Sequence, residues 1–101
     1  MELTDLLPAL RAWLSTVTIP AQVLNDDPER LRVIFETENA LAELIAGDGA
    51  YTPYRFVSFT VLDTRLALDA EPVFCDYDGE DSSIEDILRA LDRGMDCAAA
   101  L

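Results

Sequence analysis

The chain has 101 residues, and half of them are apolar. It contains 20 Asp and Glu residues, seven Arg, no Lys and no His, which gives a formal net charge of −13. The missing His excludes imidazole bases, Ser–His or Cys–His nucleophile pairs and His metal ligands, and the missing Lys excludes Schiff bases and the lysine of a phosphate-binding loop. A charge of this sign is repelled by phosphate backbones and anionic membranes, so we expect a basic protein partner, no direct nucleic-acid binding and no membrane contact.

The length predicts a single domain over residues 1–101 with one modest core. Cys75 and Cys97 fall in a predicted strand and near the end of a predicted helix, which favours buried free thiols over a disulfide. The acidic start, Met1 to Asp5, lacks the basic and apolar regions of a signal peptide, and no apolar run approaches the ~20 residues that span a bilayer. We therefore expect a cytoplasmic protein.

Apolar residues with helical spacing open the chain and predict a first helix. Thr4 is a suitable N-cap and Asp5 favours the helix dipole, so the helix is expected to begin between Thr4 and Leu7, with Pro8 in its first turn. It should end before Pro20. Its buried stripe is Leu6, Leu7, Leu10, Trp13, Leu14 and Val17.

Residues 20–46 allow two interpretations. One is a single helix over 28–46, opened by Asp27 and Pro28. The other is a hairpin of strands at 22–24 and 31–36, followed by a short helix that Thr37 caps and the glycines after Ala46 end. We favour the hairpin, because Val, Ile and Phe in succession are typical of a strand.

Two further strands and a last helix follow. Residues 54–63 are rich in aromatic and β-branched side chains and predict a strand, with 71–77 as its antiparallel neighbour. Ser82 and Glu85 have the spacing of a capping box that opens the last helix. The apolar stripe of this helix is Ile84, Ile87, Leu88, Leu91 and Met95, and Gly94 should end or weaken it. The fold is therefore predicted as α+β, a small antiparallel sheet of three to four strands with about three helices packed mainly on one face.

Catalytic and metal chemistry is not expected. Asp76, Asp78 and Glu80 alternate as in a calcium loop, but the positions that need Gly and a bidentate Glu hold Asp81 and Ile87. The acids lie in turns and on helix faces, where hydration prevents the raised pKa of a general acid, and no His or Lys activates the serines or Cys75. We predict no enzyme, no cofactor and no metal.

Acidic density is the strongest local pattern, because eight acids between Asp76 and Asp96 meet two arginines. Carboxylates three or four residues apart on a helix lie ~5–6 Å apart, which is comparable with neighbouring phosphates. Glu85–Arg89 and Arg93–Asp96 would neutralise part of this charge. The predicted partner-binding residues are Asp76, Asp78, Glu80, Asp81, Glu85, Asp86, Asp92 and Asp96.

The chain resembles, in size, acidity and lack of catalytic residues, small inhibitors of nucleic-acid-binding machinery, such as anti-CRISPR or anti-restriction proteins. Immunity proteins that neutralise nuclease toxins are an alternative. A housekeeping adaptor or structural subunit, acidic through a GC-rich or salt-adapted background, is another. Tyr51 and Tyr54 are a second candidate anchor for a partner. The sequence also leaves open whether the chain forms a homodimer.

Overall fold

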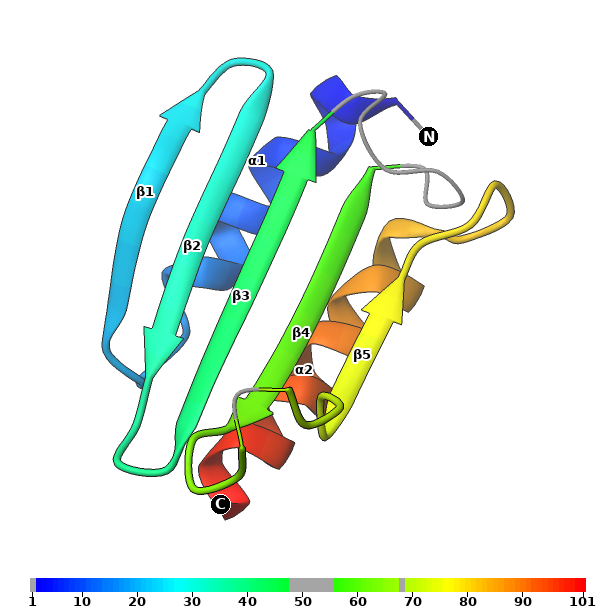
Figure 1. The fold of residues 1–101 in the computed structure, drawn as a ribbon. Helices are drawn as coiled ribbons and strands as arrows, with labels where there is room; N and C mark the ends of the chain where they lie inside the picture. The colour runs from blue at the N-terminus through cyan, green and yellow to red at the C-terminus, as the bar shows by residue number, and fades with distance from the viewer. Residues whose placement is uncertain (1, 48–55, 68) are drawn as a thin grey trace.

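Five antiparallel strands form one sheet in chain order, and two helices cover one of its faces (Figure 1). The computed structural model describes residues 2–47, 56–67 and 69–101. The elements are α1 (Leu3–Leu14), β1 (Ala21–Asp27), β2 (Arg30–Glu36), β3 (Ala40–Gly47), β4 (Val57–Asp63), β5 (Phe74–Tyr77) and α2 (Ile84–Ala100). The α+β class is confirmed, whereas the described residues form five strands and two helices instead of three to four strands and about three helices.

Helix α1 begins earlier than its sequence suggests. Its N-cap is Glu2, which shares a capping box with Asp5, so the expected cap at Thr4 is wrong. Pro8 therefore lies in the second turn, where its missing N–H leaves the Thr4 carbonyl without its helical donor. The predicted stripe is confirmed for Leu6, Leu7, Leu10 and Trp13, which are buried, whereas Leu14 is half-buried and Val17 lies beyond the end of the helix.

The hairpin of β1 and β2 is confirmed, and the helix expected after it is wrong. Residues 40–47 form β3, paired with β2 on one side and β4 on the other. Thr37 caps no helix, because its hydroxyl accepts the N–H groups of Asn39 (3.3 Å) and Ala40 (3.0 Å) and so turns the chain into β3. Small alanines alternate inward along this strand, and leave room for the helices to lie close to the sheet.

Strands β4 and β5 pair in antiparallel fashion, as predicted, although β5 is shorter than the expected 71–77. The start expected for β4, at Tyr54, lies outside the described residues. Phe74 and Asp76 of β5 face the helices, whereas Cys75 faces the other side and is exposed. The expectation of a buried thiol is therefore wrong for Cys75.

Helix α2 begins at a capping box one residue later than predicted. Ser83 is the N-cap and Asp86 its partner, instead of Ser82 and Glu85. Gly94 neither ends nor interrupts the helix, which continues to Ala100. Its role is close packing, because a Cβ at this position would lie 2.3 Å from Cε1 of Phe59 in β4.

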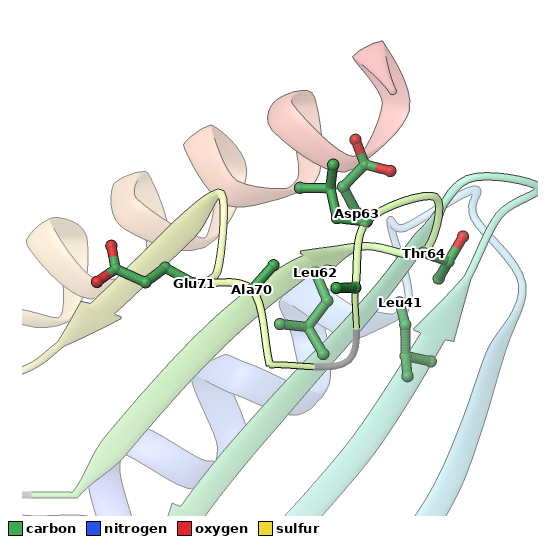
Figure 2. A pocket seen from close by; sticks show the side chains of 8 residues that line it. Leu41, Leu62, Asp63, Thr64, Ala70 and Glu71 are labelled. Carbon is green, nitrogen blue, oxygen red and sulfur yellow. The ribbon is translucent and has the colours of Figure 1, made fainter.

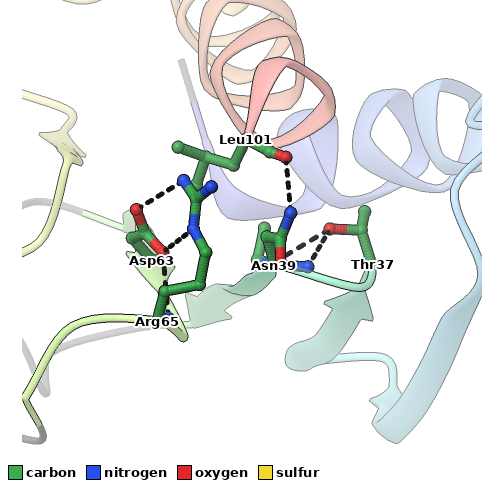
Figure 3. Close-up of polar contacts among 6 residues, drawn as sticks. Thr37, Asn39, Asp63, Arg65 and Leu101 are labelled. Atoms are coloured by element: carbon green, nitrogen blue, oxygen red, sulfur yellow. Dashed lines mark hydrogen bonds and ion pairs between the residues drawn. The ribbon is translucent and has the colours of Figure 1, made fainter.

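The core fills the layer between the sheet and the helices. A row of edge-to-face aromatic rings crosses it from Trp13 to Phe35, Phe59 and Phe74, with centroids 6.0–6.2 Å apart. Figure 3 shows two ties at one end of the sheet: Asn39 donates to the carbonyl of Leu101 at 3.0 Å, and Arg65 pairs with Asp63 at 2.9 Å. The first of these contacts joins the residue after α2 to the turn between β2 and β3, and the second joins the end of β4 to the loop that follows it.

Candidate functional site

Helix α2 has one buried side and one acidic side. Ile87, Leu91, Met95 and Ala98 face the core, as the apolar spacing predicts, while Leu88 is half-buried at its border. The opposite side carries the charged residues of the helix. We call the exposed acids of this side, together with those of the preceding turn, the acidic face: Glu80, Asp81, Glu85, Asp86, Asp92 and Asp96.

The other two predicted binding residues do not belong to this face. Asp76 is half-buried on the helix side of β5. Asp78 is buried with 5% of its surface exposed, so the expectation that it lies in a hydrated turn is wrong. The structure therefore brings six of the eight predicted acids to the surface around α2, and leaves Asp76 half-buried on the helix side of β5 and Asp78 buried.

Asp78 joins the end of β5 to the start of β4. Its Oδ1 accepts the N–H groups of Phe56 at 2.8 Å and Val57 at 2.7 Å. Its own N–H donates to the Val57 carbonyl at 3.3 Å. Oδ2 is buried and has no hydrogen-bond partner among the described residues. A buried carboxylate with two amide donors has a structural task, and nothing near it in the sequence indicates this because the amides are 21 and 22 residues away.

Two acids of the acidic face also stabilise the fold. Asp92 accepts the indole N–H of Trp13 at 2.8 Å and so links α2 to α1. Asp86 accepts the N–H of Ser83 at 3.1 Å and lies 3.5 Å from Arg89. The hydrogen bonds with Ser83, together with Arg89, lower the pKa of Asp86 below its ordinary 3.8. The sequence suggested a pair between Arg89 and Glu85, but among the described residues Arg89 pairs with Asp86 instead.

Asp81, Glu85 and Asp96 are exposed, and their carboxylates form no hydrogen bond or ion pair with the rest of the described chain. They are therefore the acids of the face that are left for an external cation. The predicted Arg93–Asp96 pair is not among the ion pairs of the described residues.

Hollows lie on both sides of α2. One, of about 250 Å³, separates the helix from the end of β5 and includes Asp76, Asp78, Asp86 and Arg93 in its lining. The other, of about 420 Å³, lies between the helix and the segment after α1. Its apolar lining includes Val17, Ile19 and Met95, and Asp92 and Asp96 lie at the same hollow. A basic side chain placed there has an apolar surface for its stem and carboxylates for its head.

The acids around α2 are spread over a surface instead of converging on a point. Within the described ranges, no group of three or more Cys, Asp or Glu side chains has the arrangement of a metal site. Carboxylates spaced in this way can contact several separate basic groups at once. Tyr51 and Tyr54, the other candidate anchor, lie outside the described residues.

No family model, curated protein or solved structure matches the chain. In the part of the chain that the structure describes, neither helix has the length and apolar character needed to cross a membrane.

Proposed function

We propose that this protein is a small acidic inhibitor that binds a basic, nucleic-acid-binding surface of a partner protein through the acidic face. The observation that carries the proposal is the separation within α2, which buries its apolar side and leaves four acids against two arginines on the other. The preceding turn adds Glu80 and Asp81. A surface of spaced carboxylates can occupy a groove whose Arg and Lys side chains otherwise bind phosphates.

The net charge supports this function beyond the contacts themselves. A chain of −13 produces a long-range field that speeds its encounter with a basic partner, and added salt screens that field. The chain has no His and no Lys, so it lacks the residues of the common nucleophile–base pairs. Catalysis of that kind therefore does not account for the acidic face. Restriction enzymes, CRISPR effectors and nuclease toxins all present basic grooves of the required kind.

A displacement assay tests the proposal directly. A restriction endonuclease, a CRISPR effector and a toxin nuclease domain are each loaded with a fluorescent DNA duplex, and the protein is titrated in at several salt concentrations. We expect displacement from at least one of the three, weakening as salt rises. The identity of the responding enzyme distinguishes an anti-restriction or anti-CRISPR inhibitor from an immunity protein.

Charge-reversal variants distinguish a specific role of the acidic face from a general effect of the net charge. The variant that carries Asp81→Lys, Glu85→Lys and Asp96→Lys changes three exposed acids that make no contact within the described fold. We expect it to weaken displacement by at least about tenfold, because each exposed ion pair contributes ~0.2–1 kcal/mol and reversal replaces attraction with repulsion.

The matched control reverses the same number of exposed acids away from α2, at Glu29, Glu38 and Glu71. It should retain displacement apart from the smaller effect of the net charge. Equal losses in the two triple variants would mean that the acidic face has no specific role, as would full activity of the first variant. Acidity as a genomic or salt-adapted background would then be the better explanation.

A further inference from the structure

One face of the sheet has no covering layer among the described residues. Both helices lie behind the sheet as Figure 1 shows it, so the face of the sheet towards the viewer is the one that α1 and α2 do not cover. The strand registers place the outward residues of each strand beside those of the neighbouring strands. We call this surface the open face; its apolar members are Ile34, Leu41, Ile45, Leu62, Cys75 and Tyr77.

Some apolar residues of the open face lie next to one another instead of being exposed singly. Leu41 and Leu62 are direct cross-strand neighbours, and Leu62 is 39% exposed. In Figure 2 these two side chains point to the same side of the sheet, away from Asp63. With Leu66 of the following loop they line an apolar hollow of about 140 Å³ at a corner of the face. These leucines therefore form a contiguous apolar patch, which is the kind of surface that marks an interaction site.

The open face is also nearly neutral in an otherwise strongly acidic molecule. Its outward strand residues include two arginines, Arg30 and Arg32, and three acids, so the face carries about −1 of the total −13. Arg32 pairs with Glu43 near its middle, at 2.7 Å. On β4 and β5 the outward residues carry no charge at all. A strongly basic partner is therefore attracted to the acidic face and not to this one.

We propose that the open face is a self-association surface on which a second copy of this chain packs, sheet against sheet, around a two-fold axis. Two chains with a net charge of −13 repel each other through their strongly acidic surfaces, and the nearly neutral open face adds little to that repulsion. A two-fold contact matches the face with itself, so that apolar side chains of each copy cover those of the other. This proposal is independent of the proposed function.

The size of the face is sufficient for a reversible dimer. Strands of four to eight residues at ~3.3 Å per residue and ~4.8 Å apart give roughly 500 Å² of flat area. Two copies then bury roughly 1,000 Å², which is the lower limit for a specific interface. Apolar side chains lie on both sides of the Arg32–Glu43 pair, and the two charges of that pair neutralise each other within one chain.

Sedimentation velocity on the full chain, from about 1 µM to about 300 µM, tests the proposal. We expect the weight-average sedimentation coefficient to rise with concentration towards that of a dimer. Raising the salt from about 50 mM to about 500 mM should strengthen association, because it screens the repulsion between the copies. This response is opposite to that of partner binding at the acidic face, so failure of one proposal is distinguishable from failure of the other.

A pair of variants locates the interface. Leu62→Glu places a carboxylate on the open face and should weaken dimerisation by at least about 100-fold, because both copies carry an unpaired charge into the contact. Val23→Glu makes the same change of charge at a residue that is 47% exposed on the helix side of β1, and should dimerise as the wild type does. Thermal unfolding of both variants checks that each is folded.

Cysteine alkylation gives a second readout that needs no substitution. Cys75 lies on the open face and Cys97 on α2, so dimerisation should slow the alkylation of Cys75 with rising protein concentration and leave that of Cys97 unchanged. A wild type that stays monomeric over the whole range overturns the proposal. So does a dimer that persists in Leu62→Glu, or a Cys75 whose alkylation rate is independent of concentration.

Discussion

Replacement of Asp78 should destabilise the protein more than replacement of any exposed acid around α2. Its carboxylate accepts two backbone N–H groups, from Phe56 and Val57, and it is 5% exposed. Asp78→Ala leaves both amides at the start of β4 without this acceptor. A hydrogen bond to a charged group contributes about 1.5–3 kcal/mol, so the two together predict a loss of about 3–6 kcal/mol.

The variant Asp78→Asn should be milder. Its amide oxygen can still accept both N–H groups, and its NH₂ group takes the place of an oxygen that has no hydrogen-bond partner in the fold. The main loss is then the charge assistance of the two bonds, about half of their strength, which is about 1.5–3 kcal/mol. The expected order of stability is wild type, Asp78→Asn and Asp78→Ala.

Urea unfolding followed by circular dichroism measures these differences, with Asp81→Ala as the control. Asp81 is exposed in the same turn, so its replacement should change the free energy of unfolding by no more than ~0.5 kcal/mol. A domain of this size unfolds with about 5–15 kcal/mol, so Asp78→Ala should lose a large share of the total. Its Tm should fall by about 12 °C or more.

Two results would refute this reasoning. If Asp78→Ala unfolds at the same urea concentration as Asp81→Ala, the carboxylate does not hold the start of β4. If Asp78→Asn is less stable than Asp78→Ala, the unpartnered oxygen matters more than the one that accepts the two amides. In either case Asp78 returns to the set of acids that could serve partner binding, since its burial is the reason for leaving it out.

Three further predictions concern α2. Gly94→Ala should cost about 1–3 kcal/mol in urea unfolding, because its Cβ would overlap the aromatic ring packed against this glycine, whereas Gly79→Ala, with space around the added carbon, should be near neutral. Asp92→Ala should cost about 1–3 kcal/mol, because the part-buried indole N–H of Trp13 loses its acceptor; a change below ~0.5 kcal/mol would show that the two helices are held by packing alone. The pKa of Asp86 is lowered in the folded state, so its contribution to stability is complete above 3.8 and disappears as the pH falls through the folded value. The difference in Tm between wild type and Asp86→Ala should therefore be present at neutral pH and vanish in strong acid, and a difference that grows on acidification would contradict this sign.

The sequence by itself determined the elements whose patterns are local. The apolar stripes of both helices and the alternation of β2 specify which residues are buried, because side-chain direction follows directly from the period of the backbone. The same reasoning placed four acids on the exposed side of α2, since a helix that buries one side must expose the other. The α+β class follows from these elements.

The tertiary structure alone decided the features that depend on distant partners. Residues 40–47 contain good helix formers, yet they form β3 because β2 and β4 supply hydrogen-bond partners along both of its edges. Gly94 is a packing contact and not a helix end, because the ring that touches it comes from β4. Asp78 is a buried acceptor and not a surface charge, because the chain returns two amides to it from 21 and 22 residues away. In each case the structure is decided by a contact between segments that are distant in the sequence, so no local pattern of residues predicts it.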